Sequence, residues 1–237
     1  MVLKGIYGVY KPKGPTSHDI IDRLRKMTGE QRIGHAGTLD PLASGVLVVG
    51  IGREATRRLG EVVKKEKEYI ADIFLGVESV TDDAEGLTSS STSGREKMRE
   101  IEKREKKEIE IEKIEKVANK FKGLIQQAPP IYSAIKVKGE KAYEAARQGK
   151  ALALKPREVE IKDIQILKYE WPHLMLKVIT GPGVYIRALA RDIGRELKVG
   201  GYLFDLERTR VGQFTKEEAL KNNSSMQLTI NEKYQLG

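Results

Sequence analysis

The stretch "RIGHAGTLDPLASGVLVVGIG", residues 32–52, contains one aspartate, Asp40, between a glycine-containing run and a proline. His35 precedes this aspartate, and the apolar run "GVLVVGIG" follows it. The apolar run predicts a buried strand, and the glycines before Asp40 with Pro41 after it predict a bent loop. A carboxylate fixed on such a loop and partnered by a cation can act as a nucleophile or a general base. An aspartate before a proline is also an ordinary turn residue, so the spacing alone leaves both roles open.

The end of this stretch also offers a nucleotide-binding interpretation. Gly50, Gly52 and Ala55 form a G-x-G-x-x-A pattern between the expected strand and an expected helix, and Asp72 follows at about the distance of a dinucleotide-binding acidic residue. However, Asp72 lies inside the expected strand "YIADIFL", whereas such an acidic residue belongs at a strand end. The remaining sequence lacks repeated βαβ units, and nucleotide binding would leave "GHAGTLDPLASG" without a role. The pattern therefore argues against a dinucleotide site.

Outward from this stretch, strands and helices follow each other without regular βαβ alternation. Strands are expected at 5–12, 67–76, 158–171, 174–180 and 202–214, with a further strand leading into the helix of 183–201. Other helices are expected within 14–29 (capped by Thr16 or Ser17), 54–65 and 95–122, the last as a largely solvated helix rich in Glu and Lys. The fold class is therefore predicted to be α+β, with a mixed, largely antiparallel sheet flanked by helices.

Composition narrows the classes of function. The chain has 237 residues, a formal net charge of +9 from 43 basic and 34 acidic residues, three histidines and no cysteine. The missing cysteines exclude disulfides, thiolate metal sites and cysteine nucleophiles, and three scattered histidines do not favour a metal site. No run of about 18 apolar residues predicts a membrane span. We expect a cytoplasmic protein with one domain over 1–237, and the positive charge favours a polyanionic partner.

Basic and aromatic residues interleave in one segment, "QQAPPIYSAIKVKGEKAYEAARQGK", residues 126–150. A Pro-Pro turn, a short strand, a Lys-Gly turn and a helix are expected there. Stacking aromatics beside cations suit single-stranded or loop RNA, although a surface hairpin with core tyrosines would give the same pattern. The residues concerned are Tyr132, Lys136, Lys138, Lys141, Tyr143 and Arg147.

Several segments, taken together, resemble the TruB family of tRNA pseudouridine synthases, in that family's order and approximate spacing. They are "GVYKPKGPTSHD", "GHAGTLDPLASGVLVVGIGREATR", "KEYIADIFLG", "APPIYSAIKVKGEKAYEAARQG", "GVYIRALARDIG" and "LERTRVGQF". The resemblance covers nearly the whole chain. It implies the pseudouridine synthase fold and an isomerase that converts the uridine at position 55, in the T-loop of tRNA, to pseudouridine.

The resemblance also implies roles for individual residues. Asp40 matches the catalytic aspartate, and Arg187 matches the arginine that pairs with it. Tyr69 matches the tyrosine that stacks on the flipped base and is a candidate for proton transfer. His35 matches the histidine on the loop that fills the space left by the base, and Leu206 an apolar residue of the uracil pocket. Further substrate contacts are expected from Tyr185, Lys136 and Arg147.

These residue types fit the chemistry that the resemblance implies. A uridine within a folded loop must be extruded, at a cost of about a few kcal/mol, and an aromatic face recovers part of that cost by stacking. The reaction needs no cofactor and no metal. The expected partner is the T-arm of tRNA, bound by a monomer without another protein or a membrane. A non-catalytic tRNA-binding or folding factor on the same scaffold remains an alternative, as does an RNA-guided relative within a ribonucleoprotein.

The chain departs from the family pattern in a few places. Ser79 and Val80 replace the first residues of the acidic segment, Val184 replaces a frequent threonine, and Glu207 stands where an arginine is common. The chain continues only about 20 residues past "TRVGQF", which is too short for a separate C-terminal RNA-binding domain. We therefore expect weaker binding of tRNA, and expect this binding to depend more on the 126–150 hairpin.

Overall fold

A computed structural model describes residues 4–88, 109–133, 135–137, 140–148, 150 and 154–225. The chain divides into two compact units. The first unit comprises Met1–Ile70, Ile179–Pro182 and Leu206–Gly237, and the second comprises Ala71–Val178 and Gly183–Asp205. Each unit is built from segments that are distant in the sequence.

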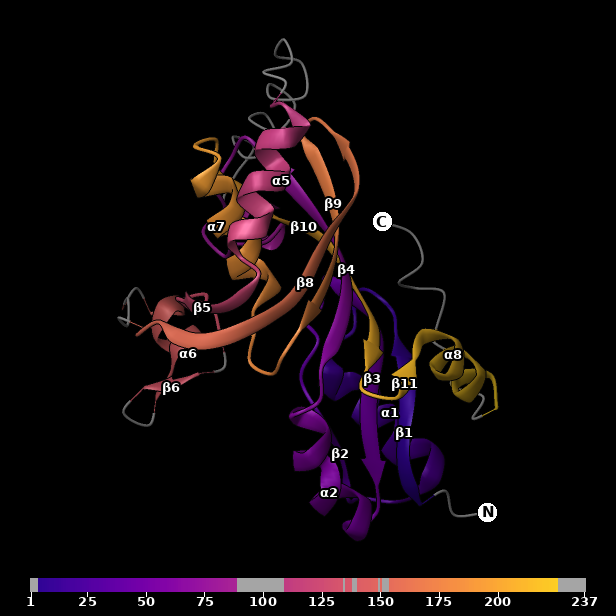
Figure 1. The fold of residues 1–237 in the computed structure, drawn as a ribbon. Coiled ribbons are helices and arrows are strands. Elements are labelled where there is room, and N and C mark those ends of the chain that lie inside the picture. Colours follow the sequence, from indigo (N-terminus) through magenta and orange to yellow (C-terminus); the bar gives the residue numbers. More distant parts are fainter. Residues whose placement is uncertain are drawn as a thin grey trace. The chain divides into compact units, whose positions relative to one another are not determined.

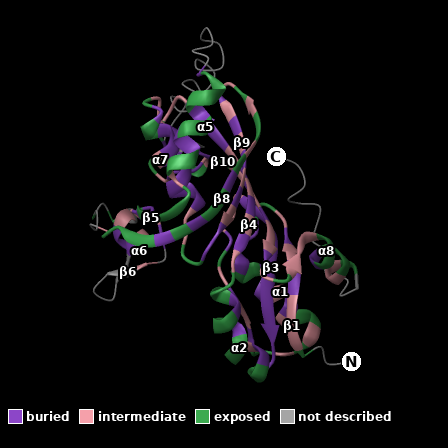
Figure 2. Cartoon of the chain, viewed as in Figure 1, coloured by how far each residue is buried: buried purple, intermediate pink, exposed green. Residues whose placement is uncertain are grey.

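The first unit is organised around strand β3, Ala43–Ile51, which is buried along its whole length (Figure 2). Strands β1 (Gly5–Lys11) and β2 (Ile33–His35) both pair antiparallel with β3. The C-terminal part of β10 (Gly201–Val211) pairs parallel with β3 and antiparallel with the short β11 (Phe214–Thr215). The continuous apolar run that predicted a buried strand is thus confirmed.

Three helices complete the first unit: α1 (Ser17–Thr28), α2 (Arg53–Val63) and α8 (Lys216–Ser225). Helix α1 begins and ends where the sequence predicts. Thr16 is its N-cap and forms a capping box with Asp19, and Gly29 ends it in the left-handed conformation. Its apolar stripe of Ile20, Ile21 and Leu24 is buried.

Helix α8 was not expected from the sequence. It lies beside β1, the edge strand of the main sheet (Figure 1). The Asn223 amide accepts a hydrogen bond from the Tyr10 backbone N–H and donates to the Tyr10 carbonyl, at 3.1 and 2.8 Å. Asn222 donates to the Gly8 carbonyl at 2.8 Å. The two asparagines therefore occupy backbone groups that an edge strand would otherwise expose.

The second unit contains most of the remaining elements. Strand β5 (Gly123–Gln127) pairs antiparallel with the long β8 (Arg157–Glu170), and β9 (His173–Thr180) is the neighbour of β8. Strands β6 (Lys136–Val137) and β7 (Glu140–Lys141) form a separate hairpin that leads into α6 (Ala142–Arg147). The unit also includes α3 (Glu85–Thr88), α5 (Ile111–Lys120) and α7 (Ile186–Glu196).

The strand order of the main sheet, within the described residues, is β1-β3-β10-β4-β9-β8-β5. Strands β4 (Lys67–Leu75), β9 and β10 each contribute residues to both units. Of the registers above, only that of β3 with β10 is parallel. The α+β class with a mixed, largely antiparallel sheet is therefore confirmed. No helix in the described part of the chain is both long and apolar enough to cross a membrane.

One expected element differs from the structure, and a second is described only in part. Residues 183–185 form no strand before α7, because Gly183, at φ +83°, ends the extended path after Pro182 and Tyr185 becomes the N-cap of the helix. Helix α5 is largely solvated, as expected: of Ile111–Lys120 only Ile114, Val117 and Ala118 are buried, and they form its apolar stripe. The part of the expected 95–122 helix before residue 109 lies outside the described residues.

The glycines after β3 serve packing rather than nucleotide binding. A Cβ on Gly50 would lie 3.0 Å from the backbone of Ala55, so glycine lets α2 pack directly on β3. Strand β10 lies between β3 and β4, whereas a dinucleotide fold places those two strands side by side. Asp72 pairs with His173, at 3.0 Å between Oδ2 and Nδ1. These features agree with the argument from sequence against a dinucleotide site.

Candidate active site

Asp40 lies on the loop that joins β2 to β3, and this loop is fastened to the start of α1. Because Thr16 caps α1, the buried Ser17 hydroxyl is free to bond the backbone of Leu39. It accepts a hydrogen bond from the Leu39 N–H and donates one to the Leu39 carbonyl, both at 2.9 Å. On the other side of Asp40, the Pro41 carbonyl accepts the Gly14 N–H at 2.8 Å. The backbone is therefore held immediately before and after the half-buried Asp40.

The buried Arg208 side chain joins the same loop to β3. Its Nε donates to the Val46 carbonyl at 2.8 Å, and its two terminal nitrogens donate to the carbonyls of Gly37 and Thr38 at 3.1 and 3.4 Å. Only 2% of Arg208 is exposed, and no ion pair links it to a carboxylate in the part of the chain described. Its donors are thus used to fix loop geometry.

Close approach of the backbones makes glycine necessary at position 45. Gly45 has φ +115°, and a Cβ there would lie 2.2 Å from the Arg208 carbonyl oxygen. Gly45 pairs directly with Arg208 in the parallel register of β3 and β10. This glycine therefore allows the strand that carries Arg208 to lie against the strand that follows Asp40.

Lys11 is a second buried cation near the loop. Its ammonium donates to the carbonyls of Pro12 and Pro15 at 2.9 and 2.8 Å, and the residue is fully buried. Burial lowers the pKa of Lys11 to about 8; the charge of Asp40 opposes this shift and the charge of Arg208 adds to it. These contacts to the β1–α1 turn indicate a structural role for Lys11.

The pKa of Lys11 predicts how stability depends on pH. The folded-state pKa of about 8 lies below the unfolded value of about 10.4, so the unfolded chain binds more protons between these pH values. Stability from this group therefore rises with pH, by about 1.4 kcal/mol per pH unit. In urea unfolding from pH 8 to 10, Lys11→Met should lose stability progressively relative to the wild type. Lys26→Met, at an exposed lysine of α1, is the control for the substitution itself. A pH-independent difference between Lys11→Met and the wild type would contradict the shift.

The other first-unit residues that the sequence singled out lie on the strands around this loop. His35 ends β2, and burial first, then the charges of Arg208 and His18, lower its pKa, so His35 is neutral at pH 7. Its Nδ1 is buried and has no hydrogen-bond partner among the described residues. Leu206 is 7% exposed and pairs with Ala43, three positions after Asp40. The structure thus places His35, Asp40 and Leu206 on or beside the same loop.

Tyr69 lies on β4, where buried and half-buried residues alternate, and only 6% of it is exposed. The neighbouring Glu68 accepts a hydrogen bond from the Thr209 hydroxyl of β10, at 2.9 Å to its carboxylate. This contact ties the start of β4 to the part of β10 that follows Leu206 and Arg208. Tyr69 is therefore a buried aromatic on the strand next to β10.

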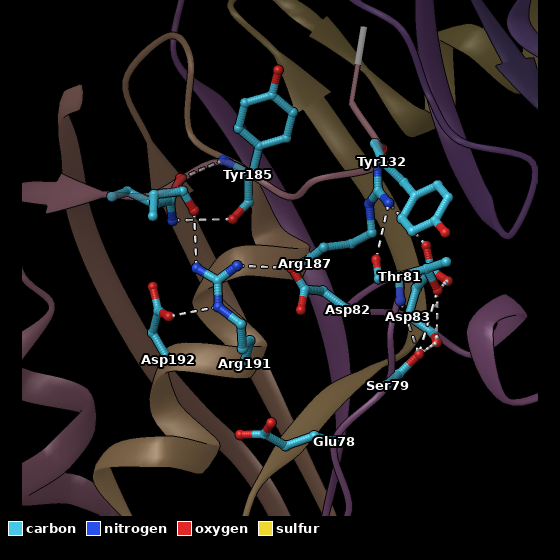
Figure 3. Close-up of polar contacts among 12 residues, drawn as sticks. Glu78, Ser79, Thr81, Asp82, Asp83, Tyr132, Tyr185, Arg187, Arg191 and Asp192 are labelled. Carbon is cyan, nitrogen blue, oxygen red and sulfur yellow. Dashed lines mark hydrogen bonds and ion pairs between the residues drawn. The ribbon is translucent and has the colours of Figure 1, made fainter. Parts of the chain in front are cut away.

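Arg187 lies in the second unit, on the first turn of α7, and is almost fully buried. Figure 3 shows its guanidinium directed toward Thr81 and Asp83. Nη1 donates to the Asp83 carboxylate and to the Thr81 carbonyl, both at 3.1 Å, and Nη2 donates to the Tyr132 carbonyl at 3.0 Å. Asp83 was not identified from the sequence as the partner of Arg187.

The acidic turn formed by residues 79–86 has its own internal bonds. Hydroxyls of Ser79 and Thr81 donate to the Asp83 carbonyl and carboxylate, respectively, and the Glu85 N–H donates to the Asp83 carboxylate at 3.1 Å. A Cβ on Gly86 would lie 2.4 Å from the hydroxyls of Ser79 and Thr81, so glycine is required there. Ser79, a departure from the family pattern, therefore contributes to the turn.

A second arginine of α7 extends this network. Arg191 pairs with Asp82 at 2.8 Å and with Asp192 at 2.8 Å, and donates to the Ala128 carbonyl at 2.9 Å. Burial raises the pKa of Asp82, and the charge of Arg191 opposes that shift. Asp82 has φ +61°, in the left-handed region that aspartate tolerates better than most residues.

Of the three remaining residues predicted to contact substrate, the structure describes the surroundings of Tyr185 only. The Tyr185 backbone is held by the buried Gln127 amide, which accepts from its N–H at 2.9 Å and donates to its carbonyl at 3.1 Å. Lys136 lies in β6 and Arg147 in α6. The side chains of Lys136 and Arg147 lie outside the described residues, so those contacts remain predictions.

Glu207 has an internal role where the family pattern has an arginine. Its carboxylate accepts the Tyr10 hydroxyl at 2.7 Å and pairs with Lys216 at 2.7 Å. These contacts connect β10 to β1 and to the start of α8. The substitution is therefore matched by partners within the first unit.

Some supporting residues were not predicted from the sequence: Ser17 and Arg208 in the first unit, and Asp82, Asp83 and Arg191 in the second. Asp82 and Asp83 stand in a quoted acidic segment, and Arg191 lies four residues after Arg187, a spacing that places both on one helix face. That spacing was the only sequence feature that indicated a shared role for Arg187 and Arg191. Nothing local distinguishes a buried arginine on a strand from an exposed one.

Comparisons with known proteins find a matching family model and similar chains. The family model described as "TruB family pseudouridylate synthase (N terminal domain)" matches residues 25–186. This chain is 42% identical to tRNA pseudouridine synthase B of Thermobifida fusca, over 91% of this chain and 72% of that protein. The protein of the same name from Clostridium novyi is 40% identical, over 97% of this chain and 75% of that protein.

Two solved structures share the fold. A chain in a Cbf5-Nop10-Gar1 complex superposes with a TM-score of 0.67 at 29% identity, over 92% of this chain and 52% of that one. A chain of an H/ACA RNP bound to a substrate RNA containing 2′-deoxyuridine gives a TM-score of 0.65 at 26% identity, over 98% and 57%. This chain thus spans little more than half the length of those two chains.

Proposed function

Because the chain belongs to the TruB family of pseudouridylate synthases, we propose that it isomerises a uridine of tRNA to pseudouridine. The uridine is the one at position 55 in the T-loop, and Asp40 is the nucleophile. The observation that carries the proposal is the fastening of the Asp40 loop by Ser17, Gly14 and Arg208. A turn residue needs no such support, whereas a reacting carboxylate must be held in a fixed position.

The proposed reaction breaks the N1–C1′ glycosidic bond, turns the base and joins C5 to C1′. The hydrogen on C5 leaves to solvent and N1 gains a proton, so atoms balance without a co-reactant. Asp40 contributes its carboxylate either by addition to the base, by attack at C1′ or by promoting elimination to a glycal. No cofactor or metal takes part in any of these routes.

The neighbouring residues have proposed roles in handling the extruded base. Tyr69 stacks on the flipped uracil and transfers a proton, and Leu206 contributes an apolar wall to the uracil pocket. His35, neutral at pH 7 because burial and Arg208 lower its pKa, fills the space that the base leaves in the RNA. Tyr185, Lys136 and Arg147 contact the substrate. The pairing of Arg187 with the catalytic carboxylate stays a prediction from the family resemblance.

The proposed partner is the T-arm of tRNA, bound by a monomer that needs no other protein. The net charge of +9 supports a polyanionic substrate. The hairpin of β6 and β7 with α6, in the segment 126–150, is the proposed RNA-binding insertion.

The proposal is tested by incubating the protein with an unmodified tRNA transcript and mapping pseudouridine at nucleotide resolution. We expect a single pseudouridine, at position 55, and none in a transcript with cytidine at that position. Binding without any product would instead support a non-catalytic tRNA-binding factor. Product formed only after addition of a guide RNA and partner proteins would support a ribonucleoprotein enzyme.

The role of the Tyr69 hydroxyl is tested by a conservative change. Tyr69→Phe keeps the aromatic face, so the Kd for tRNA should stay within about twofold, since stacking is independent of the hydroxyl. Loss of a proton-transfer group should lower the single-turnover rate about 10²-fold. Tyr69→Leu removes the ring as well and should also weaken tRNA binding. A wild-type rate in Tyr69→Phe would limit Tyr69 to stacking.

A further inference from the structure

Helix α7 carries three arginines at four-residue intervals, Arg187, Arg191 and Arg195, which places them along one face. Their acidic partners lie together in residues 78–83 and run in the opposite order: Asp83, Asp82 and Glu78. The first two pairs are buried, with arginine side chains 9% and 10% exposed, whereas the Arg195 side chain is 57% exposed. The series therefore includes two buried pairs and one solvent-exposed pair of the same kind.

The two buried arginines also bind a third segment. Arg187 donates to the Tyr132 carbonyl at 3.0 Å, and Arg191 donates to the Ala128 carbonyl at 2.9 Å. Each guanidinium thus connects α7 to an aspartate of the acidic turn and to a carbonyl of the segment 128–132. Figure 3 shows Arg191 pairing with Asp82 and Asp192 beside the Arg187 group. We call the four side chains Arg187, Arg191, Asp82 and Asp83 the double clamp.

Stability alone does not account for the Arg191 half of the double clamp. Taking two charges out of water costs about as much as their attraction returns, and well-packed apolar residues often serve equally well. The same helix already buries Ala188, Leu189 and Ile193. What a bonded guanidinium supplies, and an apolar side chain does not, is a fixed spacing between three separate segments.

We propose that Arg191 is a positioning residue: with Asp82 it fixes the acidic turn and the segment 128–132 so that Asp83 and the Tyr132 carbonyl orient the Arg187 guanidinium. The proposal rests on the proposed function, in which Arg187 serves the isomerisation. Asp82 and Asp83 are consecutive, and Ala128 and Tyr132 belong to one short segment. A shift of the Arg191 contacts therefore moves both sets of partners of Arg187.

The test uses substitutions that separate positioning from folding. Arg191→Met removes the charge and keeps an apolar stem, but leaves Asp82 buried without its partner. Arg191→Met combined with Asp82→Asn removes both charges, and asparagine tolerates the φ of +61° at position 82. Arg195→Met is the matched control, because it breaks the exposed pair with Glu78 on the same helix face.

Single-turnover rates at saturating tRNA, the Kd for tRNA and urea unfolding would be measured for each variant. We expect Arg191→Met and the double variant to lose about tenfold in rate, because small displacements of a reacting group are costly, with Kd changed less than twofold. The double variant should be more stable than Arg191→Met and yet remain slow. Arg195→Met should keep the wild-type rate. A double variant or an Arg191→Met variant that is folded and has the wild-type rate would overturn the proposal.

Hydrogen exchange gives a readout that does not depend on activity. The Ala84 N–H donates to the Leu203 carbonyl, the Glu85 N–H to Asp83, and the Tyr143 N–H to the Ser133 carbonyl. These amides should exchange about tenfold faster in Arg191→Met and in the double variant, as expected for local opening, and at the wild-type rate in Arg195→Met. Unchanged exchange would overturn the double clamp even with an active enzyme. If the wild type makes no pseudouridine, the proposed function fails. The hydrogen-exchange rates then test by themselves whether Arg191 holds the acidic turn and the segment 128–132 in place.

Discussion

Asp40→Asn should eliminate pseudouridine formation while leaving tRNA binding nearly intact. Asparagine has the shape of aspartate but no anionic oxygen, so it can neither attack C1′ nor add to the base. Removing a central catalytic group typically lowers the rate on the order of 10⁴-fold or more. The Kd for tRNA should stay within about threefold, because the loop is held through the backbone and side chains of other residues, among them Ser17 and Arg208.

The matched control for this change is Asp19→Asn, in the same unit. Asp19 is exposed and completes the capping box of α1, where its carboxylate accepts the Thr16 N–H at 2.7 Å. Its replacement should cost about 1 kcal/mol of stability and leave the rate within about twofold. Substantial pseudouridine from the Asp40→Asn variant would assign the nucleophile elsewhere.

Arg208→Met should be the second largest effect, acting on both stability and rate. It leaves the buried carbonyl of Val46 and the partly buried carbonyls of Gly37 and Thr38 without their shared donor. Unsatisfied buried groups cost about 1–3 kcal/mol each, so we expect a loss of about 3 kcal/mol after partial relaxation. The loop that presents Asp40 is then no longer fixed, and kcat should fall about 10²-fold, the effect of a displacement of about 1 Å.

Arg210→Met provides the comparison on the same strand. Arg210 pairs with Glu66 at 2.8 Å, and its side chain is 27% exposed. Breaking this partly solvated pair should cost less than about 1 kcal/mol and leave kcat within about twofold. If Arg208→Met, measured where it is fully folded, had the kcat of Arg210→Met, the Asp40 loop would not depend on Arg208.

The elements that sequence could predict are those with strong local signals. Three elements could be predicted because local residues determine them: β3 by its apolar run, β4 by its alternation, and α1 by its capping residues Thr16 and Gly29. Helix α8, whose sequence has only a weak helical pattern, was not predicted. Helix α8 is polar apart from a few residues, and the asparagine amides that dock it on β1 are visible only once β1 is known to be an edge strand.

The sequence singles out individual candidate residues, but it does not show the contacts that hold them in place. Asp40, His35 and Leu206 were identified through the resemblance to a family, and the structure groups them around one loop. Arg208 was not, because its three acceptors are backbone carbonyls and carry no side-chain signature. Asp83 lies about 100 positions before Arg187, and a pairing over such a separation depends on the tertiary fold.

The central claim, isomerisation at one uridine through Asp40, is tested most directly by release of tritium from a tRNA transcript labelled at C5 of its uridines. Isomerisation replaces the C5–H bond by the new C5–C1′ bond, so each pseudouridine formed releases one tritium to water. We predict that the wild-type protein releases the equivalent of one tritium per transcript, that a transcript with cytidine at position 55 releases none, and that Asp40→Asn releases none while still binding. Release from the cytidine transcript, or release by Asp40→Asn at the wild-type rate, would contradict the account.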